Sequence, residues 1–447
     1  MATLTDTELP EYADISRDTA IATSDSTNAP SVASSPYKSE FKTGLQDEAG
    51  YSWLLLRVQS RSPSAKNLPF FVEGDTISGV VELDATKTSS VKEVLVEIQA
   101  GATVVAQEEE IFLSLKETLW TSHAAGAGSS RKLKGLSKWS FNFILPKEVG
   151  VVGPHGRKGF YQLPPSFSER ASPAYLDYRI VVKIRRGGLR VSQKLTTTFI
   201  YQPITFPGSS MSPLMKLASA EGSPLPNPKQ DAEGWQVLPK LKLEGVLFGV
   251  RRVEVQCQLA IANPLEYALG SPLLLYLVIE SEDEQALNVL TSPTAVRVDL
   301  VRAMSTGSDA TAEKPERRSN NFFTSALSRG YFWGVDEAGC GPNRKVLHGE
   351  IDLEAKLKPT FVFPRLSIEY TVNFVGFEAT GWATESQSSK GTTMLSEPVK
   401  VTSRQLAGSV TRSTAPPGYR KPEVDYNKSL GYLENGNQRF LHHGGFF

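Results

Sequence analysis

Short segments in which apolar and polar residues alternate make up most of the chain between residues 51 and 402. In residues 178–185, every second side chain from Tyr178 to Ile184 is large and apolar, and basic residues lie at positions between them. A period of two is typical of a β-strand that has one buried face. A helical period is almost absent, so the pattern predicts an all-β chain.

Turn residues separate these segments into two series of expected strands. The first series comprises 53–58, 76–83, 91–100, 111–119, 139–144, 178–185 and 189–200. The second comprises 241–247, 251–261, 272–281, 294–303, 347–353 and 367–377. Short strands at such spacing are typical of antiparallel sandwiches, and we therefore expect two antiparallel β-sandwiches.

Changes in composition give the expected domain boundaries. Segments rich in Ser, Thr, Pro and Gly with few large apolar residues cannot bury a core, and they are expected to be linkers or disordered tails. The predicted division is a disordered tail at 1–50, a sandwich at 51–204, a linker at 205–234, a second sandwich at 235–402 with a polar insertion near 304–345, and a disordered tail at 403–447.

The two halves share a plan. In the first half, a glycine turn at Gly74 precedes Tyr178 by 104 residues, and Pro164-Pro-Ser-Phe lies before that tyrosine. In the second half, Gly270 precedes Tyr370 by 100 residues, and Pro359-Thr-Phe lies before it. The similar spacing favours two sandwiches of one type, although Pro and Gly punctuate any β protein.

A Pro-Pro-Gly-Tyr sequence lies in the C-terminal tail, where Pro416 and Pro417 precede Tyr419. Adjacent prolines favour the extended polyproline II conformation, so a partner meets a backbone that loses little entropy on binding. With a tyrosine beside the prolines, this is the form of a P-P-x-Y ligand of WW domains, in which Gly418 occupies the unconstrained position. Chance gives roughly 0.05 such motifs in a chain with 28 Pro and 14 Tyr.

The composition limits the classes of function. Acidic and basic residues balance at 48 each, which gives no overall attraction to nucleic acid or anionic membrane. Cys257 and Cys340 are too few for a disulfide framework or a cysteine-rich zinc site, which fits a reducing compartment. No apolar run approaches the 18 or so residues that a membrane span needs. The sequence lacks H-E-x-x-H and G-x-S-x-G, so we expect no metal, no cofactor and no catalysis.

Five motifs of the first half carry a resemblance to a known family. They are Glu73-Gly-Asp-x-Ile-x-Gly-x-Val, Val91-Lys-Glu-Val-x-Val-x-Ile, Trp139-Ser-Phe-x-Phe-x-Leu-Pro, Pro164-Pro-Ser-Phe and Tyr178-Arg-Ile-Val-Val-Lys-Ile. In order and spacing the chain resembles the arrestin-like proteins, especially their α-arrestin (arrestin-related trafficking adaptor) branch, over about residues 51–402. The second half departs from this pattern through its polar insertion and a weakened Gly270 turn.

The resemblance implies two immunoglobulin-like sandwiches, no catalysis, and a cytoplasmic adaptor that is recruited to the plasma membrane or endosomes. In α-arrestins, P-P-x-Y motifs bind WW-domain ubiquitin ligases of the HECT class, and the body binds membrane transporters or receptors for ubiquitination and endocytosis. Pro416, Pro417 and Tyr419 are then the expected ligase-binding residues. Leu9, Pro10 and Tyr12 form an L-P-x-Y variant in the other tail, and two motifs allow avid binding to a ligase with several WW domains.

A row of basic residues has two interpretations. It comprises Arg179, Lys183, Arg185, Arg186 and Arg190. It is either a positive surface at a sheet edge for acidic tails, phosphates or lipid headgroups, or a solvated strand face that discourages edge-to-edge pairing.

The function that these features favour is a non-enzymatic adaptor between a WW-domain ligase and the cytosolic segments of membrane cargo, with protein transport as its process. Two alternatives stay open. One is an arrestin-fold scaffold in signalling or retromer-like sorting without ligase recruitment. The other is a structural β-sandwich protein without a role in trafficking.

Overall fold

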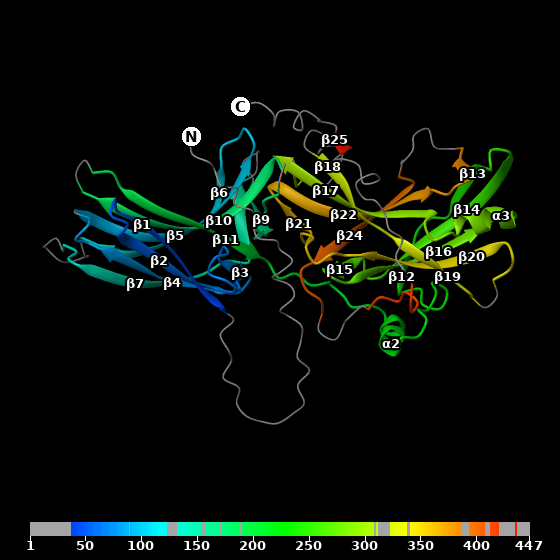
Figure 1. The fold of residues 1–447 in the computed structure, drawn as a ribbon, viewed down its shortest axis with the longest axis horizontal. Coiled ribbons are helices and arrows are strands. Elements are labelled where there is room, and N and C mark those ends of the chain that lie inside the picture. The colour runs from blue at the N-terminus through cyan, green and yellow to red at the C-terminus, as the bar shows by residue number, and fades with distance from the viewer. Residues whose placement is uncertain are drawn as a thin grey trace, which may run out of the picture. The chain divides into compact units, whose positions relative to one another are not determined.

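The computed structural model describes residues 37–88, 90–122, 132–152, 158–169, 172–187, 190–307, 310–311, 322–337, 340–385, 393–406, 412–419 and 434–435 (Figure 1). The chain divides into two compact units. The first holds the described residues up to Pro203 together with Thr306–Thr311 and Phe363–Leu366, and the second holds the others. Both units are built from antiparallel sheets, which confirms the predicted all-β class and is consistent with β-sandwiches.

The first unit has two main sheets and a hairpin. One sheet has the order β1-β2-β4-β7, formed by β1 (Ser39–Gln46), β2 (Ser52–Ser60), β4 (Thr76–Asp84) and β7 (Leu136–Ile144). The other has the order β3-β11-β10-β5-β6, formed by β3 (Phe70–Val72), β11 (Gln193–Gln202), β10 (Ala174–Arg186), β5 (Val91–Val104) and β6 (Glu110–Thr121). The hairpin pairs β8 (Glu148–Val152) with β9 (Lys158–Gln162).

The second unit also has two main sheets. The first sheet has the order β19-β20-β16-β14-β13-β23, with β12 (Trp235–Val237) paired to β14; its strands are β19 (Tyr331–Val335), β20 (Arg344–Asp352), β16 (Pro272–Glu280), β14 (Arg251–Ala262), β13 (Leu241–Leu247) and β23 (Trp382–Thr384). The second has the order β15-β24-β22-β17-β18-β25, with β21 (Phe361–Phe363) paired to β22; its strands are β15 (Glu266–Ala268), β24 (Leu395–Thr402), β22 (Arg365–Phe377), β17 (Val296–Gly307), β18 (Phe322–Arg329) and β25 (Glu434–Asn435).

The strand order repeats between the units. The path β1-β2-β4-β7 corresponds to β13-β14-β16-β20, and the path β3-β11-β10-β5-β6 corresponds to β15-β24-β22-β17-β18. In each unit a short strand pairs in parallel, β3 with β11 and β15 with β24. The turns that follow these short strands contain Gly74 at φ 85° and Gly270 at φ 78°, a conformation that favours glycine. The predicted common plan is therefore visible in the topology.

Two buried tyrosines occupy corresponding places in the cores. Tyr178 on β10 is fully buried, and its hydroxyl donates to the carbonyl of Pro164 at 2.5 Å. Tyr370 on β22 is almost fully buried, and its hydroxyl donates to the carbonyl of Lys358 at 2.6 Å. A buried hydroxyl needs a partner, and in both halves the segment near the predicted Pro-x-Phe motif supplies it.

The first unit begins earlier than the composition predicts. Strand β1 lies inside the stretch expected to be a disordered tail, and it pairs antiparallel with β2. Phe41, Thr43 and Leu45 alternate with polar residues and glycine, which is a strand signal that eight residues at a sheet edge express only weakly.

The segment expected to be a linker belongs to the second unit. It contains α2 (Pro213–Glu221), which begins after the cap Ser212, whose hydroxyl accepts from the Met215 N–H at 3.1 Å. The helix ends at Gly222 with φ 66°. Ser before Pro at the start and Gly at the end are helix signals, whereas the composition of the segment predicts a linker. The buried residues around α2 are Met215, Ala218, Leu225, Trp235, Ala260, Ala262, Leu274, Tyr276 and Val346.

The expected polar insertion near 304–345 also contains regular structure, because β18 and β19 lie within it. The second helix, α3 (Glu284–Leu290), follows β16 and has Asp283 as its cap. Among the described residues, no helix has the length and apolar character needed to cross a membrane.

Candidate functional site

Residues 412–419, which were expected to be disordered, lie against strands β19 and β20 at one edge of a sheet in the second unit. In the ladder between β19 and β20, Tyr331 is opposite Glu350 and Trp333 is opposite His348. On β16, Tyr276 is also opposite His348. Residues opposite each other share a face, so this is the face that α2 covers at Tyr276 (Figure 1).

Glu350 is the polar centre of this contact. The side chain is fully buried. It accepts hydrogen bonds from the hydroxyls of Tyr331 at 2.9 Å, Ser413 at 2.8 Å and Thr414 at 2.7 Å, and from the backbone N–H of Thr414. A buried carboxylate is costly unless it is hydrogen-bonded, and Ser413 and Thr414 contribute three of these donors. Burial and the carboxylates of Glu350 and Asp352 raise the pKa of Tyr331.

The Pro-Pro-Gly-Tyr sequence forms a β-turn. The N–H of Tyr419 donates to the carbonyl of Pro416 at 3.0 Å, and Gly418 has φ 81°. Proline at the second position and a positive φ at the third are the requirements of a type II turn. The docked segment is therefore a turn and differs from the extended polyproline II segment that the two prolines predict. The turn needs a residue that adopts positive φ at position 418, while the unconstrained third position of a WW ligand stays a prediction.

Tyr419 inserts its ring beside two aromatic residues of β19. The ring stacks on Tyr331 at 6.0 Å between centroids and 22° between planes, and it lies 5.6 Å from the Trp333 ring. Its hydroxyl donates to the carbonyl of Phe332 at 2.9 Å. Burial raises the pKa of Tyr419. Pro416 and Pro417 are exposed, whereas Tyr419 is half-buried against β19.

The second predicted motif, Leu9, Pro10 and Tyr12, lies outside the described residues. The sequence interpretation missed Glu350, Tyr331 and Trp333. A signal was present for each of them. Tyr-Phe-Trp at 331–333 is an aromatic run inside the stretch predicted to be a polar insertion. Glu350 is an acidic residue inside the expected strand 347–353.

The basic row lies on and just beyond β10, which has neighbours on both sides and is not a sheet edge. Four of its five members have partners on neighbouring segments. Lys183 pairs with Glu97 at 2.5 Å, Arg185 with Glu93 at 3.1 Å, Arg179 with Glu109, and Arg186 donates to the Thr88 hydroxyl at 2.5 Å; Arg190 is exposed. Because β10 is not an edge strand, neither a sheet-edge surface nor protection of an edge applies as predicted. The glutamates instead form ion pairs with three of the basic residues within the sheet, and binding of anionic partners by the row stays a prediction.

Glu97 is the most perturbed carboxylate of this network. Burial alone raises its pKa, but the hydrogen bonds from Lys183 and Ser114 outweigh burial and lower the pKa from 4.5 to about 2. A carboxylate stabilised in this way stays ionised in the folded unit at neutral pH.

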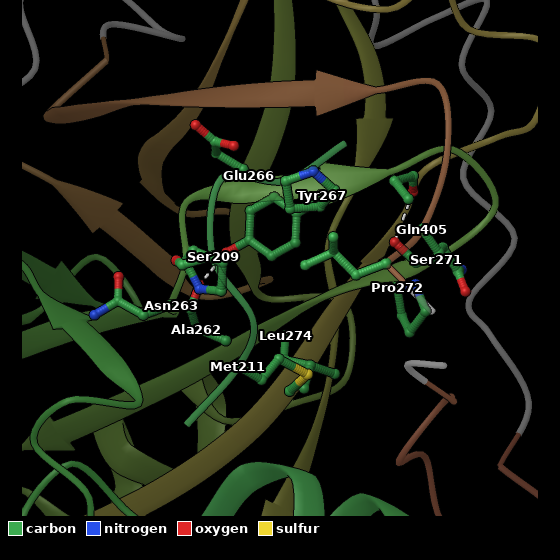
Figure 2. Close-up of a pocket in the computed structure, with 14 residues that line it drawn as sticks. Ser209, Met211, Ala262, Asn263, Glu266, Tyr267, Ser271, Pro272, Leu274 and Gln405 are labelled. Atoms are coloured by element: carbon green, nitrogen blue, oxygen red, sulfur yellow. Dashed lines mark hydrogen bonds between the residues drawn. The ribbon is translucent and has the colours of Figure 1, made fainter. Parts of the chain in front are cut away.

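A small cavity lies where the segment after Pro203 meets β15 and the residues after β24 (Figure 2). Tyr267 is at its centre, and its hydroxyl donates to the carbonyl of Ala262. The cavity volume is about 40 Å³, which is room for a few water molecules. Among the described residues, no group of three His, Cys, Asp or Glu side chains is placed to hold a metal ion.

No protein-family model matches this chain, and no curated protein matches it in sequence. The docked Pro-Pro-Gly-Tyr segment is the feature of this chain that bears most directly on its function.

Proposed function

We propose that this protein is a non-enzymatic adaptor that joins a WW-domain ubiquitin ligase of the HECT class to cytosolic segments of membrane transporters or receptors. One observation carries the proposal: Pro416 and Pro417 are exposed on the surface, next to a tyrosine at the spacing of a P-P-x-Y ligand. A WW domain can therefore reach both prolines without unfolding of the body.

The repeated strand order supports the rest of the proposal. Two units with the same order of strands are what an arrestin-type pair of sandwiches requires. In the proposed adaptor these units bind the cargo, and the protein works in the cytoplasm at the plasma membrane or at endosomes. In the proposed adaptor the recruited ligase modifies the cargo, and this chain contributes no catalytic residue.

A second candidate is favoured by the docked ring of Tyr419. If the segment only fastens the C-terminal part of the chain to β19, the protein is an arrestin-fold scaffold in signalling or retromer-like sorting and recruits no ligase. In this case Tyr331 and Trp333 are the permanent partners of Tyr419.

Peptide binding separates the two candidates. We expect a peptide spanning residues 413–422 to bind isolated WW domains of HECT-class ligases with micromolar affinity, and a Pro417→Ala/Tyr419→Ala peptide to lose this binding. Isothermal titration calorimetry measures both. A Gly418→Ala peptide is the matched control, because it keeps both prolines and the tyrosine. Absence of binding by the unchanged peptide would leave the scaffold as the better description.

A further inference from the structure

Tyr419, the tyrosine that a WW domain needs for binding, is already bound by residues of the second unit. Tyr419 contributes its ring to a stack with Tyr331 and its hydroxyl to a hydrogen bond with the carbonyl of Phe332. A P-P-x-Y ligand places its tyrosine in a pocket of the WW domain. The same ring cannot occupy both places, so the two interactions exclude each other.

We propose that residues 413–419 are a latch that withholds Tyr419 from WW domains, and that Glu350, Tyr331 and Trp333 are the catch that holds it. This inference rests on the proposed function, because it concerns access to the same motif. Glu350 holds the front of the latch through Ser413 and Thr414, and the two aromatic rings hold its end.

The latch is held by a few hydrogen bonds and by ring packing against β19. Glu350 is fully buried, whereas Pro416, Pro417 and Gly418 are exposed. The latch and β19 belong to the same chain, so their contact is intramolecular, and this raises the effective concentration of the latch at β19.

Only molecules with an open latch bind a WW domain. The apparent affinity is therefore the intrinsic affinity multiplied by the fraction of molecules that are open. We expect the full chain to bind a WW domain about 10- to 100-fold more weakly than the 413–422 peptide does, which corresponds to about 1.4 to 2.7 kcal/mol. The open state leaves Glu350 without its donors from Ser413 and Thr414, which is the physical reason that closure is favoured.

A substitution at Gly418 can weaken the latch without changing the residues that bind a WW domain. The turn needs φ 81° at this position, which costs a non-glycine residue about 1–2 kcal/mol, and a side chain there meets no neighbouring atom within 4 Å. Gly418→Ala therefore strains the closed turn without a steric clash. It changes none of the motif residues, because the third position of P-P-x-Y is unconstrained.

The experiment uses calorimetry to compare binding of one WW domain to full chains with binding to the matching peptides. All full chains carry Tyr12→Ala, which removes the second motif and leaves Tyr419 as the only motif tyrosine. We expect Glu350→Gln and Gly418→Ala in the full chain to raise the affinity toward that of the peptide, by fivefold or more, while the Gly418→Ala peptide binds like the unchanged peptide. Glu337→Gln is the matched control. Glu337 is an acidic residue just after β19, and its partners Tyr276 and Arg344 are not part of the catch. This variant should leave the affinity of the full chain unchanged.

The outcomes distinguish the latch from the function on which it rests. Equal affinity of the unchanged chain and its peptide would overturn the latch and leave the adaptor standing. No binding by the peptide would overturn both. If Glu350→Gln unfolds the second unit, as a thermal melt would show, Gly418→Ala still decides the question, because Gly418 is exposed. An unchanged affinity in a folded Gly418→Ala chain would then contradict the latch.

Discussion

We expect Tyr178→Ala to lower the free energy of unfolding of the first unit by about 3–5 kcal/mol, the usual cost of removing a large aromatic side chain from a core. Tyr178 is fully buried, and its ring lies 5.1 Å from that of Tyr201 and 5.6 Å from that of Phe199. Tyr178→Phe keeps the packing and leaves the Pro164 carbonyl without its donor, so its expected cost is about 1–3 kcal/mol.

Denaturant unfolding followed by circular dichroism measures both changes. Tyr175→Ala on the same strand is the control, because Tyr175 is only half-buried, and it should cost less than Tyr178→Ala. The repeat makes a matched prediction for the second unit, where Tyr370→Ala should destabilise in the same way. A transition that Tyr370→Ala leaves unchanged would contradict the correspondence between the two tyrosines.

The strands that the sequence predicts well are those with a strong local alternation. The pattern at 178–185 indicates a strand, and β10 runs over Ala174–Arg186. The pattern at 53–58 lies within β2, and 251–261 nearly coincides with β14. In these cases the side chains that face the core are neighbours in the sequence at a spacing of two, so a short window contains the whole signal.

The elements that the sequence interpretation missed depend on distant contacts. Helix α2 buries only Met215 and Ala218 of its nine residues, and these pack on Trp235 and Tyr276. The sequence of the helix itself does not indicate which distant residues form the surface that Met215 and Ala218 contact. Composition predicts a linker here, because Pro, Ser and Gly dominate the segment. A serine and a glycine of the same segment, Ser212 and Gly222, cap the helix.

The candidate site shows the same division. Pro416, Pro417 and Tyr419 form a motif within four residues, and a local reading finds it. Its partners Tyr331 and Glu350 lie more than 60 residues earlier in the chain. A single sequence does not indicate that residues so far apart contact each other, and only the fold brings the segment to β19.

We expect Lys183→Met to lower the free energy of unfolding of the first unit by about 2–3 kcal/mol at neutral pH. Glu97 is 1% exposed, and removal of Lys183 leaves a buried carboxylate without its closest charge partner. Loss of one partner from a buried pair costs about 3–5 kcal/mol, and the partial exposure of Lys183 reduces this value. Arg185→Met is the matched control. The Arg185 side chain is 66% exposed, and its pair with Glu93 should contribute less than about 1 kcal/mol.

The pH dependence gives this prediction a sign. The pKa of Glu97 is lowered from 4.5 to about 2 in the folded unit. The stability it contributes is fully present above about pH 4.5 and is lost as the pH falls through 2, for a total of about 3 kcal/mol. In Lys183→Met the folded pKa rises toward 4.5, so unfolding measured between pH 5 and 2 should change less steeply than in the unchanged protein.

The same two variants decide what the basic row does. If the row stabilises the sheet, Lys183→Met and Arg185→Met differ strongly in stability, and neither alters binding to vesicles that contain anionic lipid. If the row is a surface for anionic partners, both variants weaken vesicle binding to a similar degree, since each removes one positive charge. A folded Lys183→Met protein of unchanged stability that has lost vesicle binding would contradict the structural role, because Glu97 would then need no partner.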